Sequence, residues 1–132
     1  MKESFFQFSN PELVNIEFCG NENFNEELFE GFSIDNNVAI SVLDEDVCNE
    51  AQVSLNIIVG EKSESFPFYL SITMSAEFVC DKKESDKFYK LLETNAPALL
   101  LSYARPIVSM ITSQSGFPTL NLPFMNFKDK QS

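Results

Sequence analysis

The sequence predicts an α+β fold in which a four-stranded antiparallel sheet is covered on one face by a long C-terminal helix. Apolar and polar residues alternate along four stretches before residue 81, as they do in half-buried strands. The apolar period then changes to three and four residues, which is typical of an amphipathic helix. Strands followed by helices indicate an α+β arrangement with an antiparallel sheet.

The four predicted strands differ in the clarity of their patterns. They are expected at Val14–Phe18, Val38–Val42, Val53–Val59 and Phe68–Cys80. The fourth is the clearest, because seven apolar residues fall on one face and a mixed set falls on the other. An irregular crossover loop, residues 20–35, separates the first two strands, and its residues 26–29 can form one helical turn.

Two helices are expected after the sheet. The first is short and amphipathic and lies within residues 81–94. Asn95 is a favourable N-cap for a second, longer apolar helix over Ala96–Ser115. Pro106 lies in the middle of that helix and removes a backbone donor, so a kink or a break is expected there. Gly116 is expected to end the helix.

The chain is interpreted as one domain spanning residues 1–132. Its length suits a single domain, and it contains no internal repeat or Pro/Gly-rich linker. Residues 1–10 are expected to form a lead-in and residues 128–132 a polar tail. Residues 117–127 are held extended by prolines yet are strongly apolar, so they must pack on something. The apolar surface exceeds what one copy can cover, which suggests self-association.

The composition excludes several classes of function. The chain has no histidine, so it can form neither a Ser-His-Asp triad nor a His-ligated metal site, and we expect no cofactor. Nine basic and 20 acidic residues give a net charge of −11, which argues against nucleic-acid binding and against docking on anionic membranes. No apolar run approaches the ~18 residues of a membrane span. The N-terminus lacks the apolar core of a signal peptide, so we expect a cytoplasmic protein without membrane insertion.

The cysteines and the remaining acids do not suggest an enzyme. Cys19, Cys48 and Cys80 form no CxxC pair, so we interpret them as reduced, small apolar residues. Apart from Cys80, only acids such as Glu77 and Asp81 offer reactive groups. No nucleophile is paired with a base, and no Gly-rich phosphate loop is present.

The net charge is confined to the first 50 residues. They contain twelve acids and one base, which gives −11, whereas residues 51–132 contain eight of each. The same 50 residues hold seven of the 14 phenylalanines. Two interpretations stay open. The stretch is either a sheet edge and loop with solvated acids and core phenylalanines, or an apolar binding surface that charge keeps soluble.

A series of motifs in the C-terminal third matches a known family. The motifs are Tyr103-Ala104-Arg105, Ser109-Met110, Gly116-Phe117-Pro118, Leu120-Asn121-Leu122-Pro123 and Asn126-Phe127. With them, the chain resembles the SecB family of protein-export chaperones, strongly over Ala96–Phe127 and more weakly from Pro11 onward. The order of the predicted elements also fits this family.

The resemblance implies an ATP-independent holdase that binds unfolded precursor polypeptides through apolar grooves and keeps them competent for export. It also implies delivery to the SecA translocase motor and a homotetramer, a dimer of dimers with the long helices at its inner interface. In this sequence the groove residues would be Phe24, Leu28, Phe29 and Phe32. The interface residues would be Leu99, Tyr103, Ile107 and Met110.

The chain departs from the family pattern in ways that keep a second function open. It stops soon after Phe127, where the family usually has a further helix. Glu17 matches an acidic position that faces the motor, but the corresponding position on the fourth strand falls near Ser71. We expect Glu17 and the loop Asp44-Glu45-Asp46 to face a basic partner. The alternative function is a SecB-like adaptor or chaperone for one dedicated client, such as an antitoxin, without coupling to the translocase.

Overall fold

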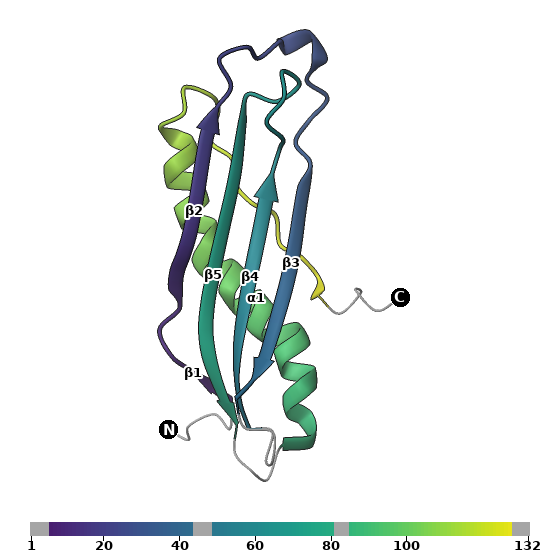
Figure 1. Ribbon diagram of the computed structural model, residues 1–132, viewed down its shortest axis with the longest axis vertical. Helices are drawn as coiled ribbons and strands as arrows, with labels where there is room; N and C mark the ends of the chain where they lie inside the picture. The colour runs from purple at the N-terminus through teal and green to yellow at the C-terminus, as the bar shows by residue number, and fades with distance from the viewer. Residues whose placement is uncertain (1–5, 44–48, 81–84, 128–132) are drawn as a thin grey trace.

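The fold is a long antiparallel sheet with one helix across it, as the computed structural model in Figure 1 shows. The structure describes residues 6–43, 49–80 and 85–127. Its elements are β1 (Phe6–Phe8), β2 (Glu12–Gly20), the short 3-10 helix η1 (Glu26–Leu28), β3 (Ile34–Val42), β4 (Glu50–Val59), β5 (Phe68–Cys80) and α1 (Ser85–Ser113). The predicted α+β class, with an antiparallel sheet and a long C-terminal helix, is confirmed.

The sheet has five strands rather than the predicted four. β5 lies at its centre, with β4 and then β3 on one side and both β1 and β2 on the other. β1 was expected to be part of a lead-in, but Phe6 pairs with Cys80 and stacks on Phe78 at 5.3 Å between ring centroids. Pro11 lies between β1 and β2 and has no backbone N–H to donate to the ladder. One edge of the sheet is therefore made of two consecutive strands, β1 of three residues and β2 of nine.

The pairing of β2 with β5 is irregular near Val14. Leu13 pairs with Met74 and Asn15 with Thr73, so the extra residue between them forms a bulge. Val14 is 60% exposed, so the regular alternation that predicted the strand Val14–Phe18 does not hold at its first residue. A bulge shifts the alternation by one residue, which a period-2 pattern cannot reveal by itself.

The hydrophobic core lies between α1 and one face of the sheet. The alternate residues of β4 and β5 that face α1 are buried, including Leu55, Ile57, Leu70 and Ile72. The buried side chains of α1 recur every four residues at Phe88, Leu92, Ala96, Leu100, Ala104 and Val108, which is the spacing of one helix face. The opposite face of the sheet is polar, with hydroxyl and amide side chains that bond across strands, as Asn56 Nδ2 does to Thr73 Oγ1 at 2.9 Å.

One continuous helix replaces the two that were predicted. α1 runs from Ser85 to Ser113 with Pro97 and Pro106 inside it, so neither the helix start at Asn95 nor a break at Pro106 occurs. Each proline removes one backbone donor, but packing of the apolar face against the sheet provides most of the stability of such a helix. Pro106 has no N–H to donate to the carbonyl of Ser102, four residues earlier. The hydroxyl of Ser102 donates to Leu99 O at 2.6 Å.

The chain reverses after α1 and returns along it as an extended segment, residues 117–127, which we call the strap (Figure 1). Gly116 has a φ of 86°, a left-handed conformation that favours glycine. Leu122 and Phe127 of the strap are buried in the core, as its apolar composition predicted. Among the described residues, no helix is long and apolar enough to span a membrane.

Candidate functional site

An apolar groove lies at one end of the molecule, where the crossover loop meets the strap. Its volume is about 510 Å³. Its lining comes from the crossover loop, from the start of β5 and from the strap, and consists of Phe24, Glu26, Phe29, Phe32, Pro67, Phe117, Pro118, Thr119 and Leu120. Most of these side chains are apolar, and Glu26 supplies the charged group. A surface of this kind is suited to hold apolar side chains of a partner.

The aromatic rings of the groove form a continuous series. Phe117 of the strap contacts Phe24 edge to face at 5.6 Å, and Phe24 contacts Phe29 at 5.9 Å. Phe29 contacts Phe32 at 5.2 Å, and Phe32 contacts Phe68 at 4.8 Å. Phe68 is fully buried. The series therefore joins an exposed wall to the core, which restricts how far the exposed rings can move.

Two asparagines attach the crossover loop to the loop between β4 and β5, Asn21 through its side chain and Asn25 through its backbone. Asn21 donates its Nδ2 to the carbonyls of Ser63 and Phe66, the latter at 3.2 Å. Asn25 donates its backbone N–H to Glu64 O at 2.9 Å, and its side chain caps η1. Both turn positions suit asparagine, whose side chain bonds readily to nearby backbone. The loop that carries Phe24 is therefore held in place by polar contacts.

The structure brings together three of the four predicted groove residues. Phe24, Phe29 and Phe32 line the groove, whereas Leu28 lies beside it and is 43% exposed. Sequence reasoning missed the wall formed by the strap. The Gly116-Phe117-Pro118 motif is the part of the sequence that could have indicated this wall. A glycine that ends a helix allows the chain to turn back, so the aromatic residue after it lies on the returning segment.

The predicted acidic residues are only partly described. Glu17 lies on the polar face of the sheet opposite Ser71 of β5, and its carboxylate pairs with the Lys62 ammonium at 3.0 Å. The hydrogen bond to Glu17 and the attraction of its charge raise the pKa of Lys62 above the usual 10.5. Glu17 is therefore held in an ion pair with Lys62. Asp44, Glu45 and Asp46 lie outside the described residues, as does Cys48.

The predicted interface residues of α1 divide into two pairs. Tyr103 and Met110 are exposed, and Met110 has 61% of its surface accessible. Leu99 and Ile107 are half-buried and pack against the core. Two of the four predicted interface residues, Tyr103 and Met110, therefore lie on the outward surface of the helix.

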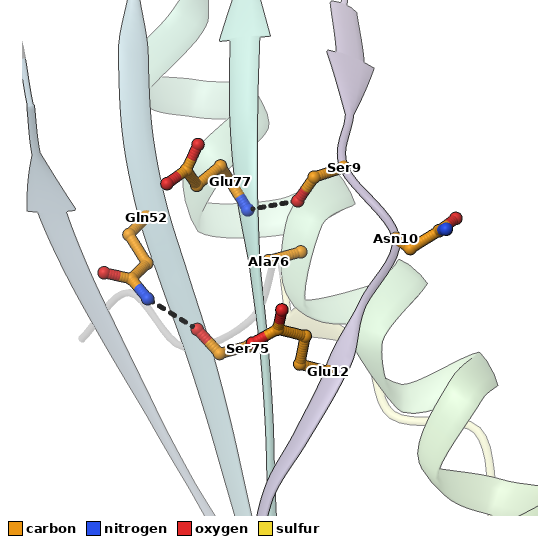
Figure 2. A pocket seen from close by; sticks show the side chains of 7 residues that line it. All are labelled: Ser9, Asn10, Glu12, Gln52, Ser75, Ala76 and Glu77. Atoms are coloured by element: carbon orange, nitrogen blue, oxygen red, sulfur yellow. Dashed lines mark hydrogen bonds between the residues drawn. The ribbon is translucent and has the colours of Figure 1, made fainter.

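A second hollow of about 340 Å³ is polar and lies where the edge strand breaks between β1 and β2 (Figure 2). It is lined by Ser9, Asn10, Glu12, Gln52, Ser75, Ala76 and Glu77. Glu77 donates its backbone N–H to Ser9 Oγ at 3.0 Å, and Gln52 Nε2 donates to Ser75 Oγ at 3.2 Å. The wall hydroxyls are therefore bonded within the protein.

The reactive groups considered from the sequence do not meet at this hollow. Glu77 is exposed on the polar face, whereas Cys80 is buried on the side of the core. Asp81 lies outside the described residues. Within the described part of the chain, no three His, Cys, Asp or Glu residues are grouped so that they could hold a metal ion.

Comparisons with known proteins point to one family. The family model described as preprotein translocase subunit SecB matches residues 20–130. An uncharacterised protein of Methanocaldococcus jannaschii is 29% identical over 124 residues, which span 91% of this chain and 78% of that protein. The protein-export protein SecB of Histophilus somni strain 2336 is 32% identical over 79 residues, which span 58% of this chain but 46% of that protein.

Two solved structures share the fold. The Mycobacterium tuberculosis Rv1957 SecB-like chaperone, in complex with a ChAD peptide from the Rv1956 HigA1 antitoxin, superposes with a TM-score of 0.70 over 92% of this chain and 88% of its own, at 13% identity. A Streptococcus agalactiae protein of unknown function superposes with a TM-score of 0.58 over 90% of this chain and 97% of its own, at 14% identity. Because the SecB family model matches residues 20–130, which is most of the sequence, this chain belongs to the SecB family.

Proposed function

We propose that this protein is a chaperone that holds unfolded polypeptide segments in its apolar groove. The observation that carries the proposal is the series of phenylalanine rings that runs from the core to the exposed groove. Membership of the SecB family supports a chaperone function. The Mycobacterium tuberculosis chaperone of the same fold is in complex with a peptide, which supports a polypeptide as the ligand.

The groove suits a holdase that accepts many sequences. Phenylalanine offers a large contact area and has no polar group that needs a specific partner. Each Å² of apolar surface removed from water contributes roughly 25 cal/mol, before the costs of association and of ordering the client. Affinity then depends on apolar content more than on exact sequence. Such binding needs no nucleotide, since capture and release follow the client's own folding.

The proposed client class is unfolded precursor polypeptides on their way to the Sec translocase, with SecA as the receiving motor. The similarity to a protein-export protein SecB supports this choice. The second candidate is a single dedicated client, such as an antitoxin, without coupling to the translocase. It is supported by the antitoxin peptide in the Mycobacterium tuberculosis complex.

The proposal includes an assembly, a polar docking face and a compartment. Tyr103 and Met110, together with Leu99 and Ile107, would lie at the inner interface of a homotetramer, and their partial exposure supports this. Glu17, with the loop Asp44-Glu45-Asp46, would attract a basic partner such as the motor. The protein would act in the cytoplasm, where precursors are made.

The proposal is tested by light scattering and by competition. Purified protein is added while denaturant-unfolded citrate synthase is diluted into buffer, and we expect aggregation to be suppressed at a stoichiometric ratio. Unrelated unfolded proteins should then compete with a labelled unfolded protein for binding to the groove. Displacement of the labelled client by unrelated unfolded chains supports the general holdase. Failure of every unrelated chain to bind would contradict it and favour the dedicated client.

A further inference from the structure

Two polar side chains of α1 hold the strap near its middle. Arg105 donates its Nε to Leu122 O at 2.8 Å, and its guanidinium lies 4.2 Å from the ring centroid of Phe124. One turn further along the helix, Ser109 donates its hydroxyl to Asn121 Oδ1 at 2.9 Å. The strap runs antiparallel to α1, because the later helix residue contacts the earlier strap residue.

Thr112 continues the same stripe and is 0% exposed. Its hydroxyl donates to Val108 O at 2.8 Å and accepts the backbone N–H of Leu120 at 2.9 Å. Both the donor and an acceptor site of the hydroxyl are therefore in use. A valine would fill nearly the same volume but would leave the N–H of Leu120 without this partner, and a buried unsatisfied donor is costly.

The strap contacts are directly connected to the groove. Leu120, which Thr112 holds, lines the groove together with Phe117, Pro118 and Thr119 of the strap. Leu122, which Arg105 holds, is fully buried. Residues 117–126 of the strap form no helix or strand, so side chains rather than a backbone ladder hold the strap on the helix along this stretch. The register of the strap on α1 thus decides where the ring of Phe117 stands relative to Phe24.

We propose that Arg105, Ser109 and Thr112 form a polar rail that positions the strap as the second wall of the groove, and that Thr112 is the positioning residue with the largest effect on client affinity. The proposal rests on the proposed function of the groove. It also gives a physical role to part of the motif series, because Arg105 and Ser109 lie in the segments Tyr103-Ala104-Arg105 and Ser109-Met110, and the strap residues that they and Thr112 hydrogen-bond lie in Leu120-Asn121-Leu122-Pro123.

The test compares Thr112→Val with a matched control, Thr94→Val. Thr94 lies on the same helix and its hydroxyl donates to Lys90 O at 2.7 Å, the same bond to the fourth preceding carbonyl, but its second hydrogen-bond partner is Asn95. It lies beside the far end of the strap, residues 125–127, and not beside the groove residues of the strap. Two quantities are measured in the full chain: amide hydrogen exchange at Leu120, and the affinity for fluorescently labelled, reduced and carboxymethylated α-lactalbumin. We expect Thr112→Val to speed exchange at Leu120 and to weaken the affinity, each by about tenfold relative to the control.

Rescue separates positioning from a general loss of stability. Thr112→Ser keeps the hydroxyl, so it should restore slow exchange at Leu120 and most of the affinity, although it removes a buried methyl group. Unchanged exchange in Thr112→Val would overturn the rail. Faster exchange with unchanged affinity would overturn its link to the groove. If Thr112→Val does not fold, Ser109→Ala is compared with Ser102→Ala in the same two measurements. If the wild-type protein binds no unfolded chain, the proposed function fails, while exchange at Leu120 still decides the rail.

Discussion

Replacing Phe29 by serine should weaken both folding and client binding, and a matched control separates the two effects. Phe29 is the ring between Phe24 and Phe32 in the aromatic series, and 36% of its surface is exposed. It therefore has a part that packs against the protein and a part that is free to contact a client. Serine removes both parts and leaves the backbone of the loop able to keep its conformation.

The expected size of each effect follows from these two parts. A phenylalanine side chain has roughly 200 Å² of surface, so about 70 Å² of Phe29 is available to a client and about 130 Å² is packed. At ~25 cal/mol per Å², the exposed part contributes at most about 1.8 kcal/mol to binding, which is roughly 20-fold in Kd. The packed part corresponds to about 3 kcal/mol of folding free energy, an upper bound because unfolded chains already bury some apolar surface.

Phe8 provides the matched control. It is also a phenylalanine, is 44% exposed, and lies in β1 at the end of the molecule opposite η1 (Figure 1). Urea denaturation should show a comparable loss of stability in Phe29→Ser and Phe8→Ser. Fluorescence anisotropy with the labelled α-lactalbumin should show weaker binding in Phe29→Ser alone. Equal affinity losses in the two variants, or wild-type affinity per folded molecule in Phe29→Ser, would refute the reasoning.

The loop anchor, the ion pair and the helix surface each lead to a further prediction. Asn21→Ala removes the two side-chain bonds that Asn21 donates to the carbonyls of Ser63 and Phe66, so the melting temperature should fall by about 5 °C; an unchanged value would show that these bonds contribute little. Lys62→Met leaves the Glu17 charge unpaired, so a basic peptide should associate faster at low salt but not at ~0.5 M salt; equal rates at low salt would contradict a role for this acid. Because the pKa of Lys62 is raised in the fold, the ion pair should stabilise the protein below pH 10.5 and should lose that effect as the pH rises through the raised pKa. Urea titrations of the wild type and of Lys62→Met at several pH values can measure this difference in stability. Met110→Asp should lower the native mass while Ser102→Asp should not; identical masses would place the interface elsewhere.

Features of the fold that depend on neighbouring residues were predicted more accurately than features that depend on contacts between distant segments. The alternation along β5 extends over many residues and needs only a sheet with one buried face, so it was predicted correctly. The bulge at Val14 and the pairing of β1 depend on how an edge strand fits against β5, which no short pattern contains. Likewise, Asn95 and Pro106 have local preferences against an unbroken helix, but the packing of α1 on the sheet outweighs them.

The site shows the same division. The acidic and phenylalanine-rich crossover loop could be recognised from its composition, and three of its rings do line one groove. The opposite wall is formed by Phe117 and Leu120, which follow Phe24 by more than 90 positions in the chain. Composition says nothing about such a pairing, because it depends on where the chain reverses and on which side chains of α1 hold the returning strap.

The amino-acid order alone therefore established the fold class, the exclusion of histidine chemistry, the concentration of charge in the first 50 residues and the resemblance to the SecB family. The fold class, the exclusion and the charge distribution follow from composition and from periods of two to four residues, which act between near neighbours, whereas the resemblance rests on the motif series in the C-terminal third. Tertiary structure decided that Glu17 is paired with Lys62, that the helix is continuous, and that Thr112 meets Leu120 beside the groove. Each of these depends on contacts between distant segments, whose geometry is set only when the sheet, the helix and the strap pack together.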